Sequence, residues 1–357
     1  MTLSAPARDL LVRLDLLRSV GPRSARVVLR SLAGLELLRT YRAHIYRGLW
    51  EDAAAEVGAD VMDGGSGVLE VSLGGRSTLV QQEVVSLDDA AAIEVSFDKP
   101  LVHRMLAARG LPVPTHVELG RTGTAGLPAL GPCPWVVKPA DAGVGAGVTC
   151  GVRTPAQLRR ARLVARRFSE RVLVELEVPG ESFRILVLDG EVIGAVRREA
   201  PRVTGDGRST IAQLVATEND RRLAARGQAG LWLLRIDHEM LFTLRAAGLG
   251  PRSVLPAGTT IAVKTATNQN AAHENHTVHE LHPDVRAAVV ASAKAVGLRL
   301  AGVDLIARSV TEPLATTGGV VLEVNALPGL HHHALVSDEN SATRVAVPIL
   351  RKLLECP

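Results

Sequence analysis

The stretch VVLEVN (residues 320–325) decides the fold, because a carboxylate and then a carboxamide interrupt an apolar run. Side chains alternate between the two faces of a β-strand, so Val321, Glu323 and Asn325 are predicted to share one face. Asp304 interrupts a second apolar run upstream in the same way. Oxygen ligands on two strands suggest Mg²⁺, which normally accompanies a phosphate substrate.

The composition is that of a soluble globular protein. The 357 residues are 46% hydrophobic and 22% charged, with a net charge of +4, enough to bury a core in two or three lobes. No run is apolar enough to span a bilayer, and the N-terminus lacks the core of a signal peptide. Aromatic residues are only 3% and basic residues are dispersed, so no nucleic-acid or membrane partner is expected. The three cysteines form no paired framework, which favours the cytoplasm.

Pattern changes divide the chain into three parts. Residues 1–62 are helical in pattern. Residues 63–95 are predicted to form a small β-rich segment, whose short strands are separated by glycines, and residues 96–357 are predicted to mix helices with strands. Asp98 is a predicted N-cap of a helix that ends at Gly110. The other elements expected are strands at 135–139 and 172–175, a hairpin turning at 189–190, and helices at 154–168, 283–296 and 341–354, the last kinked by Pro348.

A strand that ends at Lys138 runs into a loop carrying Gly143, Gly145 and Gly147. Glycines let backbone N–H groups approach oxyanions closely, and the lysine can neutralise phosphate charge. The loop is not a Walker motif, because the lysine precedes the glycines, and an ordinary turn is the competing interpretation. Residues 174–182 can form an adenine hinge, with an ordinary strand end bearing surface glutamates as the alternative.

The order of these parts is more specific than any one of them: a lysine, a strand-lysine-glycine loop, a hinge, a basic residue, an aspartate and Glu-x-Asn. In this order the chain resembles the ATP-grasp superfamily, and it is similar to the ATP-grasp half of cyanophycin synthetases over about residues 63 to 335. The motifs that carry the second similarity are Asp98-Lys99 with LPVP (111–114), GDGRSTI (205–211), LRLAGVDL (298–305) and LEVNALPG (322–329).

The resemblance implies an α+β fold in which two subdomains, about 111–178 and 179–340, clamp ATP. It also implies a role for each matching residue. The implied set is Lys99 and Lys138 at the α- and β-phosphates, Gly143, Gly145 and Gly147 in a lid over them, Glu175 to Val178 at adenine, Ser182 at the ribose, Arg198 near the γ-phosphate, Arg184 near the phosphorylated substrate, and Asp304, Glu323 and Asn325 as Mg²⁺ ligands.

The chain also departs from the family pattern. Ser182 stands where an acidic ribose ligand is usual. The Mur-ligase-like half that elongates cyanophycin is absent, so full cyanophycin synthesis is not expected. The segment NQNAAHENH (268–276) replaces a glycine pair, so a different substrate is expected, with Asn268, His273 and His333 as candidate contacts.

Histidines recur at every third residue from 273 to 282. A Zn²⁺ site is one interpretation of this run. Exposed loop histidines or substrate contacts are the preferred interpretation, because the spacing is not a standard zinc signature.

The function that the resemblance implies is an ATP-dependent carboxylate–amine ligase, which forms a peptide or amide bond through an acyl phosphate. ATP and two Mg²⁺ ions are the implied cofactors, and amino acids or short peptides the implied substrates. Dimers are common in the family, so a homodimer is a candidate state. A small-molecule kinase of the same fold and a non-catalytic nucleotide-binding protein are the alternatives.

Overall fold

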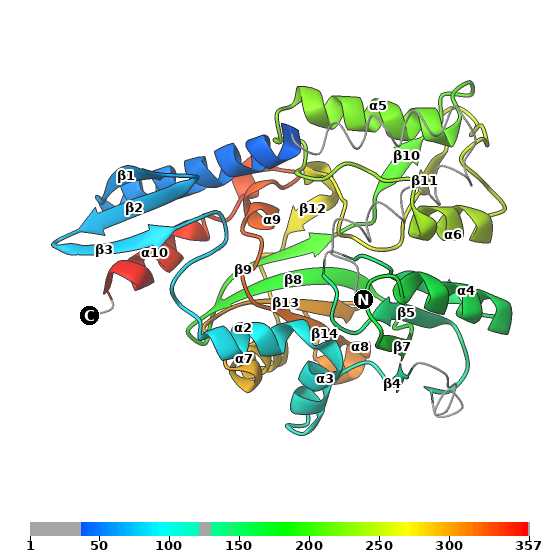
Figure 1. The fold of residues 1–357 in the computed structure, drawn as a ribbon, viewed down its shortest axis with the longest axis horizontal. Coiled ribbons are helices and arrows are strands. Elements are labelled where there is room, and N and C mark those ends of the chain that lie inside the picture. Colours follow the sequence, from blue (N-terminus) through cyan, green and yellow to red (C-terminus); the bar gives the residue numbers. More distant parts are fainter. Residues whose placement is uncertain (1–36, 121–129, 144, 356–357) are drawn as a thin grey trace.

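The computed structural model describes residues 37–120, 130–143 and 145–355. Figure 1 shows a central sheet with a second sheet on one side and a three-stranded sheet on the other. Most of the predicted helical region 1–62 lies outside the described residues, and its last part forms a helix over 37–57.

The central sheet is antiparallel, with the strand order β12-β9-β8-β13-β14. Asp189 and Gly190 join β8 to β9 and both have positive φ angles, the geometry that a tight hairpin turn requires. The strands are β8 (Glu181–Leu188), β9 (Glu191–Arg198), β12 (Asn275–Thr277), β13 (Leu300–Ala307) and β14 (Val320–Asn325).

One face of this sheet is covered by helices, which Figure 1 shows below it. The helices are α2 (Ala90–Phe97), α3 (Lys99–Ala107) and α7 (Pro283–Val296). Their apolar side chains join those of β8 and β13 in one buried cluster. This packing explains why β13 reads as a nearly continuous apolar run, since it is buried on both faces.

The second sheet has the order β4-β7-β5-β6. Its strands are β4 (His116–Leu119), β5 (Trp135–Pro139), β6 (Thr149–Val152) and β7 (Val172–Leu176). Helix α4 (Pro155–Ala165) packs on it and begins with a capping box formed by Thr154 and Gln157. The helix ends before residue 168, three residues earlier than the sequence pattern predicts.

The third sheet is a meander of β1 (Asp60–Gly65), β2 (Val68–Leu73) and β3 (Arg76–Val80). It packs with the helix over 37–57 and with α10 (Ala346–Glu355). The prediction of a helix from residue 341 kinked by Pro348 is wrong. Helix α10 begins at Ala346, so Pro348 occupies its first turn, where a missing N–H leaves no bond unmade.

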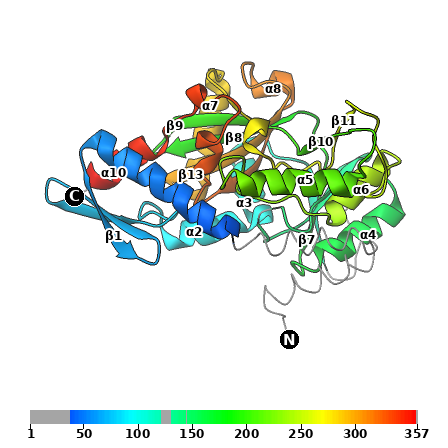
Figure 2. The same cartoon turned by 90° about the horizontal axis from the view of Figure 1, so that it is seen from above.

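A separate lobe over residues 202–263 has its own apolar cluster and was not predicted. Figure 2 shows its helix α5 running beside α6 at the opposite end of the molecule from β1. The lobe contains β10 (Arg202–Thr204), α5 (Ile211–Ala224), α6 (His238–Ala246) and β11 (Thr260–Ala262). After the lobe, the chain forms four short helices, which are η2 (Ala272–Glu274), α8 (Leu314–Thr317), α9 (His331–Ala334) and η3 (Glu339–Ser341). No helix within the described ranges is long and apolar enough to cross a membrane.

Asp98 caps α3 and also binds Arg171, which offers a test of the fold. Its carboxylate accepts a hydrogen bond from the Leu101 N–H at 2.9 Å and one from Arg171 at 2.6 Å. Burial raises the pKa of Asp98, but Arg171 and Leu101 lower it by more. We expect Asp98→Ala to reduce the free energy of unfolding by about 1–2 kcal/mol, as measured by urea denaturation.

Asp98→Asn keeps an oxygen for the cap but removes the charge and one of the two oxygens that accept from Arg171, so it is the matched control for the cap. Because the folded-state pKa is depressed, the charge stabilises the fold above the unfolded-state pKa and this contribution disappears as the pH falls through the folded-state value. The stability gap between wild type and Asp98→Asn should therefore close toward acid pH. A gap of the same size at pH 7 and at strongly acid pH would contradict this account.

Candidate active site

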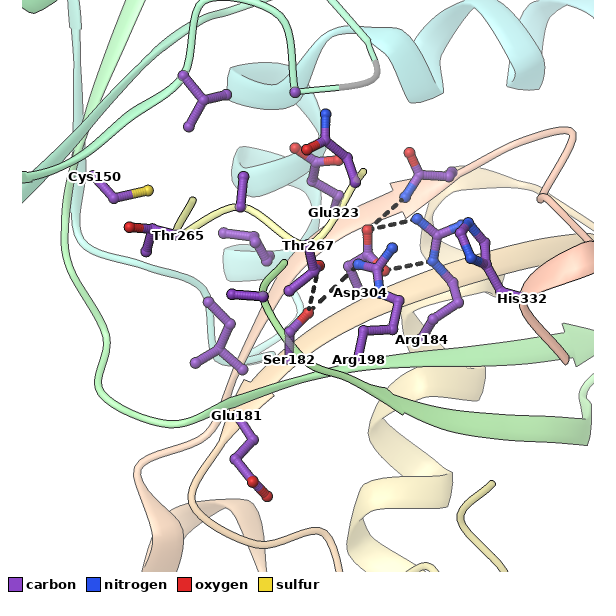
Figure 3. A pocket seen from close by; sticks show the side chains of 18 of the residues that line it. Cys150, Glu181, Ser182, Arg184, Arg198, Thr265, Thr267, Asp304, Glu323 and His332 are labelled. Carbon is purple, nitrogen blue, oxygen red and sulfur yellow. Dashed lines mark hydrogen bonds and ion pairs between the residues drawn. The ribbon is translucent and has the colours of Figure 1, made fainter. Parts of the chain in front are cut away.

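A cavity of about 630 Å³ lies where the central sheet meets the four-stranded sheet. Its wall includes side chains from β5, β7, β8, β13 and β14, together with Arg42 from the helix over 37–57. Figure 3 shows Asp304 between the side chains of Arg184 and Arg198, with Glu323 on one side and His332 beyond Arg184.

Asp304 has both carboxylate oxygens hydrogen-bonded. Oδ1 accepts from Arg184 Nε and, at 3.1 Å, from Arg198 Nη2, while Oδ2 accepts from Arg184 Nη2 at 2.8 Å. Asn325 Nδ2 donates to the same Oδ2 at 3.3 Å. Burial raises the pKa of Asp304, but the two guanidinium groups lower it by more. The carboxylate is therefore ionised inside the protein.

Strand register brings Glu323 next to Asp304. The two residues are opposite one another in the β13–β14 pair, and Leu305 is opposite Val321, so Leu322 has no partner in the register. This bulge means that the expectation of one shared face is wrong for Val321, which is fully buried in the apolar cluster under the sheet. Leu322, Glu323 and Asn325 line the cavity instead. Bulges commonly re-aim side chains beside active sites.

Lys138 is buried, with an exposed fraction of 3%. Its Nζ lies 2.8 Å from Glu175 Oε1 and 3.8 Å from Glu323 Oε1. Lys99 Nζ lies 3.9 Å from the same Glu323 oxygen and donates to the Ala142 carbonyl at 2.6 Å. Burial lowers the pKa of Lys138, but Glu175 and Glu323 raise it by more. The distances place the Nζ atoms of Lys99 and Lys138 beside the same oxygen of Glu323.

The wall near β7 is apolar, with Val136, Val148, Leu176 and Val178 among its residues. The N–H groups of Leu176 and Glu177 already donate to the carbonyls of residues 115 and 134. A backbone donor to a bound base must therefore come from Val178 or later in the chain. The Glu175 side chain binds Lys138, so this member of the predicted hinge contributes to the charged centre.

Ser182 lies close to the charged centre. Its Oγ is 3.4 Å from Arg198 Nη2 and 3.4 Å from Thr267 Oγ1. Figure 3 shows the neighbouring Glu181 pointing away from this group, and Glu181 binds Arg197 at 2.6 Å. Glu181 also lines the cavity.

The three glycines of the loop have different surroundings. Gly145 has a φ of +66°, which favours glycine, and a Cβ there would come 2.2 Å from the Asn268 amide nitrogen, so a larger residue would strain the backbone and displace the Asn268 side chain. Gly147 packs against Phe168. Gly143 lines a smaller neighbouring cavity that Lys99 and Lys138 also line. Residue 144 of the loop lies outside the described residues.

The chain is similar to known proteins in sequence and in fold. No family model matches the chain. Cyanophycin synthetase of Trichormus variabilis is 30% identical over 274 residues, which cover 76% of this chain and 30% of that protein. The glutathione biosynthesis bifunctional protein of Streptococcus thermophilus is 29% identical over 266 residues, or 72% of this chain and 35% of that protein. The chain spans about a third of the length of these relatives.

Among solved structures, a bifunctional glutathione synthetase from Pasteurella multocida superposes with a TM-score of 0.52 at 23% identity. The superposition covers 83% of this chain and 42% of that one. The chain has the ATP-grasp fold, and over 76% of its length it is similar to a cyanophycin synthetase.

The predicted Mg²⁺ ligands of this ATP-grasp chain are compatible with a magnesium site. Asp304, Glu323 and Asn325 offer carboxylate and carboxamide oxygens on two neighbouring strands, and all three line the same cavity. Hard oxygen donors of this kind are what Mg²⁺ prefers. Asp304 is bound here by guanidinium groups, which supply the positive charge that its carboxylate requires.

The histidines divide into three groups. His331 and His332 line the cavity. His333 is fully buried behind the wall, packed against Gly194, and burial with the nearby arginines lowers its pKa to about 3. His273 is exposed and does not line the cavity. Across the described ranges, no three His, Cys, Asp or Glu residues gather closely enough to hold a metal, so the zinc interpretation gains no support.

Sequence reasoning missed the residues that reach the cavity from the N-terminal part of the chain. Arg42 and Glu83 both line it, 2.9 Å apart. Neither belongs to a family motif, and neither interrupts an apolar strand. Only the packing of the helix over 37–57 against the three-stranded sheet brings them to the site.

The buried pair of Lys138 and Glu175 gives a second prediction. Removing either partner leaves an uncompensated buried charge, which costs about 3 kcal/mol or more. We expect Lys138→Met and Glu175→Gln each to lose stability of this size in urea denaturation, and the double variant to lose clearly less than the sum.

The surface ion pair of Arg47 and Glu51 is the matched control. Arg47→Gln should leave the denaturation curve almost unchanged, because exposed pairs contribute little. Strict additivity of the Lys138 and Glu175 effects would show that the two buried groups are not coupled.

Proposed function

We propose that this protein is an ATP-dependent carboxylate–amine ligase, which forms a peptide or amide bond and releases ADP and phosphate. The observation that carries the proposal is the cavity, which has an apolar wall at β7 and a charged centre built from Lys138, Glu323, Asp304 and two arginines. This cavity suits a nucleoside triphosphate, because the base can lie against the apolar wall and the phosphates beside the cations and oxygen ligands. The similarity to cyanophycin synthetase supports the same reaction class.

In the first step an oxygen of the substrate carboxylate bonds to the γ-phosphorus, and the bond from that phosphorus to the bridging oxygen of ADP breaks. We assign to Lys138 and Arg198 the stabilisation of the charge that spreads over the phosphoryl oxygens. Arg184, hydrogen-bonded to Asp304 through two nitrogens, is the proposed contact of the acyl phosphate. Magnesium, which we propose as two ions held by Asp304, Glu323 and Asn325, would neutralise phosphate charge when bound.

In the second step the amine nitrogen bonds to the acyl carbon, phosphate leaves with the carbon–oxygen electron pair, and the amine loses a proton to solvent. The acyl phosphate must be sheltered from water until the amine arrives. The glycine loop around Gly145 is the proposed cover, because it lies over the cavity against Asn268. The reaction requires no nucleophile from the protein, since positioning and electrostatics can carry the rate.

We propose amino acids or short peptides as substrates, residues 96–357 as the catalytic unit and the cytoplasm as its location. Two alternatives predict different products. A kinase of this fold would release ADP without any amine, and a non-catalytic protein would bind the nucleotide without turnover. The charged centre argues against a purely structural role, because burying so many ionisable groups is costly without a ligand.

The test is an ADP-release screen over pairs of acids and amines, with mass spectrometry of the products. We expect ADP only when Mg²⁺, a carboxylate and an amine are all present. Glu323→Gln should reduce release to background, because it removes the carboxylate beside Lys99 and Lys138. Exposed Glu312 offers the control substitution, Glu312→Gln, which should retain full activity.

Release of ADP without amine would support a kinase instead. Full turnover by Glu323→Gln would refute the role given to that carboxylate.

A further inference from the structure

One part of the cavity wall is built from segments outside the two nucleotide-binding sheets. Arg42 comes from the helix over 37–57, Glu83 from the turn after β3, and His331 from the start of α9. Arg42 Nη2 donates to Glu83 Oε1 at 2.9 Å, and its Nε donates to the Gln82 side chain at 3.1 Å. The proposed ligase mechanism makes no use of this ion pair.

The ion pair of Arg42 and Glu83 is held in place by contacts with neighbouring residues. The Arg42 guanidinium lies over the Tyr46 ring, with Cζ 4.9 Å from its centroid. The Tyr46 hydroxyl is 3.0 Å from His331 Nδ1 and accepts a hydrogen bond from the Leu330 N–H at 3.1 Å. Trp50 Nε1 donates to the Gln82 carbonyl at 2.8 Å. Three segments far apart in sequence thus fix one ion pair at the cavity wall.

Its hydrogen bonding is incomplete. Arg42 Nη1, Glu83 Oε2 and His331 Nε2 are enclosed atoms without a hydrogen-bond partner among the described residues. Enclosed polar atoms are nearly always bonded, and leaving one unpaired costs stability. Arg47, on the same helix but away from the cavity, uses its nitrogens on two carboxylates. The unused donor and acceptor at the cavity therefore point to a ligand.

The ligand should carry both signs of charge. Both residues line the cavity, and each keeps one enclosed atom without a hydrogen bond, a guanidinium nitrogen on Arg42 and a carboxylate oxygen on Glu83. Burial, followed by the field of Arg42, Arg184 and Arg198, holds the pKa of His331 well below its usual range, so His331 is neutral and adds no charge. A carboxylate and an ammonium on one carbon match this arrangement.

We propose that Arg42 and Glu83 recognise the head group of an α-amino acid substrate, Arg42 binding its carboxylate and Glu83 its ammonium. The inference rests on the proposed ligase function and names a substrate class for it. When the α-carboxylate and the α-ammonium group are both held by the ion pair, neither of them is the group that reacts. The amino acid therefore reacts through its side chain, as the carboxylate that is phosphorylated or as the amine that displaces phosphate.

The experiment compares wild type with Arg42→Gln and Glu83→Gln in the ADP-release assay. Aspartate, glutamate and lysine are supplied as such, as Nα-acetyl derivatives and as α-methyl esters, each with a range of partner acids or amines. Losing one charged hydrogen bond should raise KM for the amino acid roughly tenfold or more, while KM for ATP and kcat at saturation stay close to wild type.

In wild type, blocking either charge should weaken binding. In Glu83→Gln, acetylation of the α-amine should carry little further penalty. Arg47→Gln and Glu51→Gln on the same helix are the matched controls and should behave as wild type. An unchanged KM in both cavity variants, or blocked derivatives that react as well as free amino acids, would overturn the proposal.

Failure of the proposed function is separable from failure of this inference. If wild type releases no ADP with any pair, calorimetry measures binding of the same amino acids to protein loaded with Mg²⁺ and a non-hydrolysable ATP analogue. Binding that weakens in both variants supports the head-group site, and absent or unaffected binding overturns it. If Arg42→Gln does not fold, Arg42→Lys replaces it, and its unfolding temperature shows whether it is folded. A similar rise in KM is expected, because lysine lacks the planar guanidinium group that binds a carboxylate through two nitrogens.

Discussion

The buried charge of Asp304 is the constraint on which the centre of this protein depends. A carboxylate inside a protein remains ionised only where cations and hydrogen-bond donors replace its water. Here the two-nitrogen contact from Arg184 and the single contact from Arg198 provide that replacement. Each guanidinium in turn stays buried because of Asp304. The three side chains therefore orient one another, and both arginines are set toward the cavity before any substrate arrives.

Antiparallel register produces this arrangement. Asp304 on β13 faces Arg184 on β8 from one side and Glu323 on β14 from the other. Ser182, two residues before Arg184, faces Arg198 on β9. Because three strand pairings place these groups in two neighbouring rows of the sheet, the charged centre is as rigid as the sheet itself. A site on strands can hold such groups more precisely than a site on loops.

Much of this framework could be predicted from the sequence, because its determinants are local. Polar interruptions of apolar runs located Asp304 and Glu323, the Asp189-Gly190 pair located the hairpin, and Asp98 located a helix start. The bulge at Leu322 could not be predicted, since alternation in sequence assumes unbroken pairing. Nor could the lobe over 202–263, because the apolar cluster that stabilises it is formed by residues scattered along the segment.

The contribution of the N-terminal part was invisible for a different reason. Arg42 and Glu83 are 41 residues apart, and each is an ordinary polar residue in its own segment. Their meeting depends on the buried Tyr46 and Trp50, which pack the helix over 37–57 onto the rest of the chain. Tertiary packing of this kind has no signature in local periodicity.

Two ion-pair systems on the cavity wall differ in where their unbonded atoms lie. Both oxygens of Asp304 are bonded, and the unbonded atom of its system is Arg198 Nε, on a cation proposed to meet phosphate. The pair of Arg42 and Glu83 keeps a donor and an acceptor unbonded, a cost that folding alone does not recover. A ligand that supplies the missing bonds would recover it, and the binding free energy would then include relief of a penalty already present in the empty protein. Selectivity follows from the same argument, because a ligand with only one of the two charges would leave the other atom unbonded.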